Sequence, residues 1–203
     1  LTACEGVLLV VDASQGIQAQ TVSNFSLAKE KHLKIIPVIN KIDLPVADPD
    51  RVKQQLENVF GLDKDSIITA SAREGEGIEE ILNAIIRHIP PPGGETEKPL
   101  RALIFDSTFN NYRGVLVFIR VMEGRITPGT KIILMATGKT FTVTEIGIFK
   151  PNLSPVGELS AGMVGYLTAN IRSVSDVTVG DTITVEKMPA GSPLPGYKPV
   201  KPM

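Results

Sequence analysis

The first 90 residues alternate short apolar runs with longer segments whose apolar positions recur at helical spacing. The apolar runs occupy residues 6–12, 34–40 and 66–70, and they are typical of strands that helices cover on both faces of a sheet. The segments that follow them predict helices over residues 18–32, 48–61 and 77–89. In the second helix, Asp48 is the expected N-cap, Pro49 the first helical residue and Gly61 the stop. This order predicts half of a doubly wound parallel sheet.

The pattern changes after a proline-rich segment. Three successive prolines at residues 90–92 fix backbone torsions and remove hydrogen-bond donors, so they predict a semi-rigid linker. Beyond residue 98 the chain shows no convincing long amphipathic helix. Instead, short β-rich runs separated by Gly, Pro, Asn or Asp lie at residues 100–106, 114–122, 131–135, 140–147, 163–169 and 181–185. Such a series predicts a small closed β-barrel, because closure removes exposed sheet edges.

The predicted fold class is therefore α/β followed by all-β. We expect residues 1–92 to be the C-terminal part of a nucleotide-binding domain, residues 93–98 a linker, residues 99–187 the barrel and residues 188–203 a connector toward a third domain. A first residue other than Met and a last segment rich in proline favour a piece of a longer protein.

Net charge, apolar runs and cysteine content exclude some classes of protein but do not identify the function. The chain has 203 residues and a formal net charge of −1, which gives no case for wholesale attraction to nucleic acids or membranes. The longest apolar run, residues 7–11, is too short to span a bilayer, and no signal-peptide pattern is present. The single cysteine, Cys4, excludes an internal disulfide framework and fits a reducing cytosol.

Candidate chemistry begins with Asn40, Lys41 and Asp43, which follow the apolar run 35–39 at the carboxyl end of a predicted strand. A carboxylate can accept hydrogen bonds from the N1–H and the N2 amino group of guanine together, a pair that adenine lacks on that edge. An Asn side chain can donate a hydrogen bond to guanine N7 and also hydrogen-bond to a neighbouring loop. A Lys stem can lie along a purine face. Ligand sites in open α/β sheets lie at such strand ends. The tetrapeptide by itself also fits a strand that ends in an ordinary polar turn.

A second loop favours the base-binding interpretation. Ser71 and Ala72 end the next predicted strand, one helix further along the chain. Small residues allow the backbone to approach a ligand closely, so a backbone N–H here can reach guanine O6. Two such loops in this order are hard to explain as unrelated turns.

The 203 residues contain no recognisable motif for binding or hydrolysing the phosphates of a nucleotide. The best approximation to the phosphate-binding loop Gly-x-x-x-x-Gly-Lys-Ser/Thr is residues 124–131, where the last two residues are in the wrong order and the context joins two strands. We interpret this segment as a tight β-turn. The chain is expected to hold no catalytic residue and no metal site, and to hydrolyse no GTP by itself. Whether it binds GDP is left open, since most nucleotide affinity in this fold comes from phosphate and Mg²⁺ contacts.

The order of strand, Asn-Lys-Ile-Asp, helix, Ser-Ala, helix, linker and barrel resembles the translational GTPases, and within them the LepA family of bacterial elongation factors. The base-binding loops are common to GTPases, whereas the barrel and the exit segment point to LepA. The stretches that carry the resemblance are residues 3–13, 37–45, 99–107, 111–115 and 194–202. The resemblance covers essentially the whole chain and implies that residues 1–92 belong to a GTP-binding domain. It implies that the intact protein uses GTP and GDP with Mg²⁺.

The resemblance also implies partners and site residues. Asn40, Lys41 and Asp43 would hold guanine, with Ser71 and Ala72 at O6. The barrel would dock on small-subunit ribosomal RNA, in ribosomes that carry tRNA. The intact protein would act there in elongation quality control and back-translocation. Its candidate RNA contacts are Arg113, Arg120, Arg125, Lys131 and Lys139. A cytoplasmic location follows, and peripheral association with the cytoplasmic side of the membrane is left open.

Two alternatives stay open at this point. The parent protein can be another translational GTPase, of the elongation factor G or BipA type. The chain can also be a non-enzymatic module that binds RNA or the ribosome.

Overall fold

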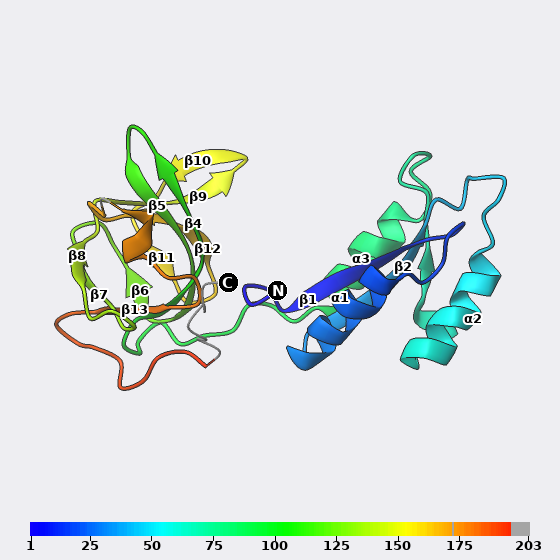
Figure 1. Cartoon of the computed structure of the whole chain (residues 1–203), viewed down its shortest axis with the longest axis horizontal. Coiled ribbons are helices and arrows are strands. Elements are labelled where there is room, and N and C mark those ends of the chain that lie inside the picture. The colour runs from blue at the N-terminus through cyan, green and yellow to red at the C-terminus, as the bar shows by residue number, and fades with distance from the viewer. Residues whose placement is uncertain (172, 196–203) are drawn as a thin grey trace. The chain divides into compact units, whose positions relative to one another are not determined.

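The computed structural model describes residues 1–171 and 173–195. The chain divides into two compact units, Leu1–Pro91 and Pro92–Met203, which are described separately. Figure 1 shows strands and helices alternating in the first unit. Its elements are β1 (Gly6–Asp12), α1 (Ala19–Glu30), β2 (Lys34–Asn40), α2 (Pro49–Phe60), the short 3-10 helix Lys64–Ser66, β3 (Ile68–Thr69) and α3 (Ile78–His88).

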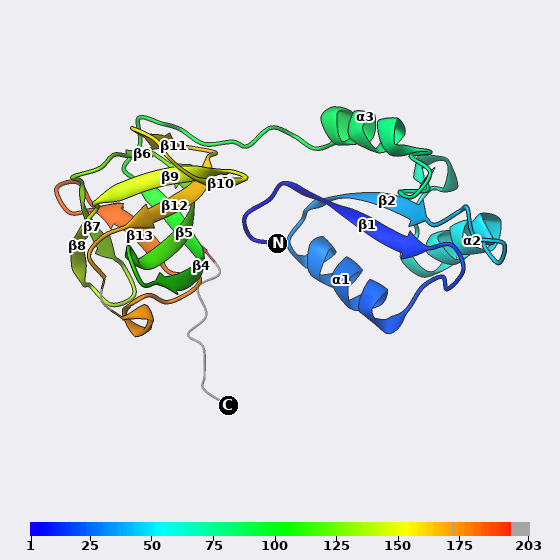
Figure 2. The same cartoon turned by 90° about the horizontal axis from the view of Figure 1, so that it is seen from above.

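The three strands of the first unit form a parallel sheet in the order β1-β2-β3. One face packs against α1 and α2, through buried residues that include Leu9, Phe25 and Leu56. The opposite face packs against α3, which lies over Ile36 and Val38. Figure 2 shows the sheet nearly edge-on between α1 and α3. The predicted half of a doubly wound sheet is confirmed.

The caps of α2 follow the sequence prediction. The Asp48 carboxylate accepts a hydrogen bond from the Arg51 amide at 3.0 Å, and Pro49 is the first helical residue. Gly61 ends the helix with a φ of +67°, a left-handed conformation that glycine adopts without a steric penalty. The helix α1 is shorter than predicted, because Gln18 is extended and His32 has a φ of +54°.

The second unit consists mainly of antiparallel strands. An eight-stranded sheet has the order β10-β9-β12-β5-β4-β13-β7-β8, and β11 pairs with β6 in a two-stranded sheet. The strands are β4 (Arg101–Asn110), β5 (Gly114–Glu123), β6 (Arg125–Ile126), β7 (Lys131–Leu134), β8 (Thr140–Thr142), β9 (Glu145–Lys150), β10 (Asn152–Pro155), β11 (Leu159–Ser160), β12 (Val164–Thr168) and β13 (Thr182–Val185).

Figure 1 shows that the sheet of the second unit is curled, and one cluster of buried apolar side chains from its strands forms the core of this unit. Along β5, alternate residues Val115, Val117, Ile119 and Val121 are buried in it, as the two-residue period of a strand requires. In the described residues the hydrogen-bonded ladder runs from β10 to β8 without a pairing between those two strands. Closure of the predicted barrel therefore stays a prediction.

One predicted strand is divided in two. The run 140–147 forms β8, which pairs with β7, and β9, which pairs with β12. Between them the chain changes partners: the Val143 amide donates to Thr130 O, and the Thr144 amide donates to Thr168 O. The sequence shows no Gly or Pro at this point, so the change depends on contacts from distant strands.

The expected connector is partly packed. The amides of Ala190 and Leu194 donate to the hydroxyls of Thr184 and Thr182 at 2.9 and 2.8 Å, and Leu194 is buried. Residues 196–203 of the connector lie outside the described residues. At the other end, Glu95 O in the expected linker accepts a hydrogen bond from the Gly124 amide at 2.8 Å. The assignment of these segments as linker and connector stays a prediction.

Candidate functional site

The two predicted base-binding loops lie side by side at the carboxyl end of the sheet. The first follows β2 and the second follows β3, which is the neighbouring strand. Backbone hydrogen bonds hold them together, from Ala70 N to Ile39 O at 2.8 Å and from Ile42 N to Ala70 O at 3.3 Å. The parallel pairing of β2 and β3 therefore brings together residues that are about 30 positions apart in the sequence.

Side chains join the two loops directly. The Ser71 hydroxyl donates to Asp43 Oδ1 at 2.7 Å, and the Ala72 amide donates to Asn40 Oδ1 at 3.1 Å. Ser71 is fully buried, and its hydroxyl also accepts a hydrogen bond from the Glu74 amide at 3.1 Å. The Asp43 side chain is 15% exposed, so it is mostly covered but still reaches the surface.

Lys41 extends toward the first strand. Its φ is +66°, a left-handed conformation that is uncommon for a residue with a side chain. Its Nζ lies 2.8 Å from Asp12 Oδ2, at the end of β1. The hydrogen bond from Lys41, supported by those from Ser14, holds the pKa of Asp12 far below its usual range. The same contact with Asp12 raises the pKa of Lys41, so both groups are charged at neutral pH.

Two charged residues beside the site were missed by the sequence interpretation. Asp12 contacts Lys41, and Arg73 Nη1 lies 3.9 Å from Asp43 Oδ2. Arg73 is 79% exposed and also approaches Glu74 Oε1 at 3.4 Å. A signal for Asp12 was present, because it too ends a buried apolar run, directly opposite Asn40 in the parallel register.

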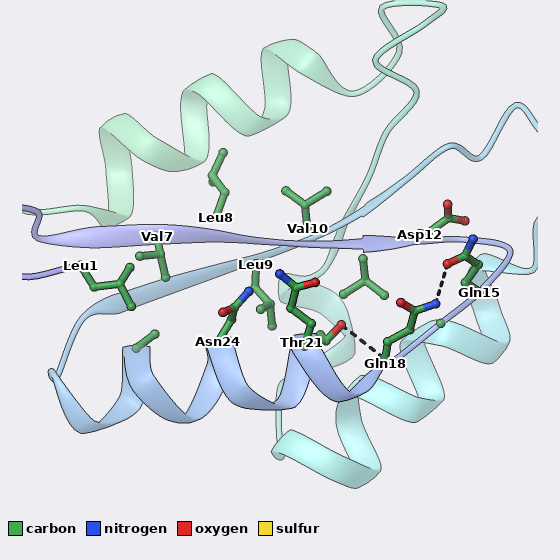
Figure 3. A pocket seen from close by; sticks show the side chains of 14 residues that line it. Leu1, Val7, Leu8, Leu9, Val10, Asp12, Gln15, Gln18, Thr21 and Asn24 are labelled. Atoms are coloured by element: carbon green, nitrogen blue, oxygen red, sulfur yellow. Dashed lines mark hydrogen bonds between the residues drawn. The ribbon is translucent and has the colours of Figure 1, made fainter. Parts of the chain in front are cut away.

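A cavity of about 710 Å³ adjoins this edge of the sheet, between β1 and α1. Figure 3 shows Val7 and Leu9 directed toward α1, Leu8 and Val10 on the other side of the strand, and Asp12 at the strand end. The cavity wall does not include Asn40, Lys41 or Asp43. This cavity is thus adjacent to the base-binding loops without being formed by them.

Other site types have no support in the part of the chain that the structure describes. Across residues 1–171 and 173–195, no three His, Cys, Asp or Glu side chains converge as metal ligands would. Within the same residues, no helix has both the length and the apolar character needed to cross a bilayer. The segment that approximates a phosphate loop forms β6 and then a turn, closed by a hydrogen bond from Thr130 N to Thr127 O at 3.2 Å.

Comparison with known proteins places both units in translation factors. Residues 1–91 match the family described as Elongation factor Tu GTP binding domain, and residues 114–184 match Elongation factor Tu domain 2. The whole chain is 58% identical to elongation factor 4 of Aquifex aeolicus and covers 34% of it. It is 56% identical over its whole length to elongation factor 4 of Bacillus subtilis and covers 33% of it. The chain as a whole is thus similar to part of elongation factor 4.

Solved structures agree on the fold. The apo form of translation elongation factor SelB from Methanococcus maripaludis matches 92% of this chain with a TM-score of 0.78, at 21% identity. The match covers 41% of the SelB chain. At this identity the likeness concerns the fold alone. It confirms the α/β and β-rich fold classes, and the chain spans about a third of the length of its elongation factor 4 relatives.

The five basic residues that were expected to contact RNA lie apart from one another along the second unit. Arg120 is 5% exposed. The other four side chains are 38% to 63% exposed, and each approaches a carboxylate. These pairs are Arg113 with Glu145, Arg125 with Glu97, Lys131 with Glu186 and Lys139 with Asp176.

Proposed function

We propose that this chain supplies guanine recognition to a ribosome-associated translational GTPase. The observation that carries the proposal is the pair of hydrogen bonds between loops, Ser71 to Asp43 and Ala72 to Asn40. These bonds hold the Asp43 carboxylate and the Ala72 amide in position at the carboxyl end of the sheet before a ligand binds. Such preorganisation reduces the conformational entropy that binding must remove.

Each group has a distinct part in holding the base. The Asp43 carboxylate accepts from the N1–H and N2 amino groups of guanine, and Ser71 keeps it oriented. The Asn40 side chain offers its amide NH₂ to N7, since its Oδ1 is engaged by Ala72. The Ala72 N–H is the proposed donor to guanine O6, and a bound base would share or replace its bond to Asn40.

The proposed ligand of the intact protein is GTP or GDP with Mg²⁺. The acceptor edge of Asp43, in a loop held by buried Ser71, fits a guanine ring. The Lys41 stem fits along the ring face, because its ammonium is held at Asp12. Mg²⁺ neutralises phosphate charge when nucleotide is bound and supports hydrolysis in such enzymes. For the 203-residue chain alone we expect no measurable GTP hydrolysis.

The base specificity can be tested with Asp43→Asn. Xanthine presents a carbonyl where guanine presents its N2 amino group, so an amide at residue 43 is expected to favour xanthosine diphosphate over GDP. Binding to the purified chain is measured by NMR titration with GDP, xanthosine diphosphate and ADP. Asp65→Asn, an exposed substitution of the same kind, is the control and should keep the preference for GDP. Equal binding of ADP and GDP by the unsubstituted chain would overturn the proposal.

For the whole protein we propose GTP hydrolysis in elongation quality control and back-translocation, on ribosomes that carry tRNA. The β-rich unit would contact small-subunit ribosomal RNA through exposed Arg113, Arg125, Lys131 and Lys139, while Arg120 contributes only if its buried side chain becomes accessible. The test is GTP turnover by a full-length protein that contains this segment, with and without ribosomes. Ribosome stimulation with GTP and none with ATP is expected.

The location that follows from this proposal is the cytoplasm, with peripheral membrane association as a separate question for fractionation. The alternative of a non-enzymatic ribosome-binding module predicts ribosome binding without any nucleotide turnover by the full-length protein. The same turnover measurement therefore distinguishes the two functions.

A further inference from the structure

Asp12 is the acidic residue that lies beside the base-binding loops without belonging to either of them. It ends β1, and the parallel register places it directly opposite Asn40. The Ala13 amide donates to Asn40 O at 2.8 Å, so the strand end is fixed against the first loop. Figure 3 shows the Asp12 side chain at this strand end. Its position thus depends on sheet pairing rather than on a flexible surface segment.

The two oxygens of Asp12 have separate contacts. Oδ1 accepts from the Ser14 amide at 2.8 Å and from the Ser14 hydroxyl at 2.6 Å. Oδ2 lies 2.8 Å from Lys41 Nζ. The Asp12 side chain is only 17% exposed, whereas Lys41 is 55% exposed. Ser14 therefore anchors the carboxylate, and the carboxylate in turn holds the more exposed and longer side chain.

The backbone at Lys41 indicates that this arrangement is enforced. Its φ of +66° is unfavourable for a residue with a Cβ, and such a conformation persists where surrounding contacts determine it. With the backbone fixed and the ammonium held at Asp12, the lysine stem has both ends defined. A Lys stem is otherwise among the most mobile side chains, and ordering it opposes binding.

We propose that Asp12 is a positioning residue for guanine binding, which holds the Lys41 ammonium so that the lysine stem is already ordered where it packs along the base. This role rests on the proposed function of the site. Asp12 touches no part of the base in this arrangement and acts only through Lys41. The Asp12 carboxylate then contributes to base binding from a strand outside both base-binding loops.

The test is a double-mutant cycle on the purified chain. Asp12→Asn keeps an oxygen for Ser14 and removes the charge that holds Lys41, whereas Lys41→Met keeps an apolar stem and removes the ammonium. GDP affinity, measured by titration of ribose-labelled GDP, is expected to fall about threefold to fivefold in Asp12→Asn, the upper part of the range for an exposed ion pair. In the Lys41→Met background the same Asp12 substitution should change nothing, because a positioning residue has nothing left to position.

A second measurement separates positioning from general loss of structure. Side-chain NMR relaxation at the Lys41 ε-carbon is expected to show an ordered methylene in the unsubstituted chain and increased motion in Asp12→Asn, at a temperature where thermal unfolding shows both chains to be folded. Glu57→Gln, which removes the carboxylate charge 3.0 Å from Lys64 Nζ, is the matched control and should leave both GDP affinity and Lys41 order unaltered.

The outcomes are distinguishable. GDP binding that is unaffected by Asp12→Asn, or an equal loss in the Lys41→Met background, would overturn the role of Asp12 and leave the base site intact. No detectable binding of GDP by the unsubstituted chain, even at millimolar concentration, would overturn the proposed base site in this chain and the positioning role with it.

Discussion

The Ser71 hydroxyl donates a hydrogen bond to Asp43 Oδ1 at 2.7 Å, although the two residues lie 28 positions apart. Ser71 is fully buried and its backbone is itself fixed, because its amide donates to Glu76 O at 2.9 Å. The carboxylate that is proposed to bind guanine is thus oriented by a side chain from the second loop. Ser71 therefore has a role in the site beyond being small enough for close backbone approach.

Ser71→Ala is expected to weaken GDP binding about tenfold while the chain stays folded. The substitution removes the donor to Asp43 and leaves the Glu74 amide without its acceptor, and a hydrogen bond to a charged group contributes about 1.5–3 kcal/mol. The measurement is a GDP titration together with thermal unfolding.

Ser66→Ala is the matched control for this change. The Ser66 hydroxyl donates to Asp63 O at 2.6 Å in an exposed turn away from the site, so GDP affinity should be unchanged. A Ser71→Ala chain that binds GDP as tightly as the unsubstituted chain would show that Asp43 does not need this orientation.

Asn40→Ala is expected to loosen the contact between the two loops at Ala72. The substitution removes the acceptor of the Ala72 amide, whose hydrogen bond is 3.1 Å long. Ala72 is exposed, so its amide can bond to water and the free energy of unfolding should fall by only about 0.5–1 kcal/mol. Hydrogen exchange of the Ala72 amide, measured by NMR, should become faster.

The control for Asn40→Ala is Asn83→Ala, on the exposed surface of α3, which should leave Ala72 exchange unchanged. Slow exchange of Ala72 in the Asn40→Ala chain would mean that another group protects this amide, and the coupling between loops would then not depend on Asn40.

The parts of the structure that the sequence predicted are those with local signals. The cap at Asp48 and the stop at Gly61 could be recognised because each depends on neighbouring residues alone. The base-binding loops could be recognised because strand ends are visible as the ends of apolar runs. Their closeness followed from the rule that neighbouring parallel strands end at the same edge.

The parts that the sequence did not predict depend on pairing between distant segments. The contact from Asp12 to Lys41 requires knowing that β1 lies beside β2 in one particular register. The division between β8 and β9 depends on Thr144, which leaves one partner strand and bonds to Thr168 on another. Neither feature leaves a mark in the local pattern of apolar residues.

A buried carboxylate makes the stability of the second unit dependent on pH. Asp181 is 1% exposed, and its Oδ1 accepts from the amides of Ala136 and Thr182 at 2.9 and 2.6 Å. Within the described residues its Oδ2 has no hydrogen-bond partner. Burial raises the pKa of Asp181 above its ordinary value, although the two amides oppose the shift.

The sign of the effect follows from proton binding. Because the folded state holds this proton more tightly than the unfolded chain, the protonated acid stabilises the fold below the unfolded pKa of about 4. That contribution is lost as the pH rises from there through the folded pKa. The amide in Asp181→Asn does not titrate. The decrease in the free energy of unfolding between the unfolded and folded pKa of Asp181 should therefore be smaller in this variant, whether or not the variant is less stable overall.

Urea unfolding at a series of pH values measures this slope. All three tyrosines lie beyond residue 91, at positions 112, 166 and 197, so tyrosine fluorescence reports on the second unit. Asp50→Asn, an exposed residue of α2, is the control and should keep the slope of the unsubstituted chain. An identical slope in Asp181→Asn would mean that this carboxyl does not titrate differently in the folded state.

Gly147→Ala is expected to destabilise the second unit by overpacking. A Cβ at residue 147 in β9 would lie 2.4 Å from Tyr166 Cε1 and 2.5 Å from Ser154 O. The tyrosine ring is fully buried and its hydroxyl donates to Glu145 Oε1 at 2.8 Å, so neither the ring nor the backbone of β10 can yield at little cost. Inserting a methyl group into such a contact costs about 1–3 kcal/mol. Urea unfolding followed by tyrosine fluorescence should show this loss. Gly157→Ala, where no atom lies within 4 Å of the added Cβ, should show none. Equal stability of the two variants would mean that Tyr166 can move away from β9, and that the packing of its ring on Gly147 does not fix the pairing of β9 with β12.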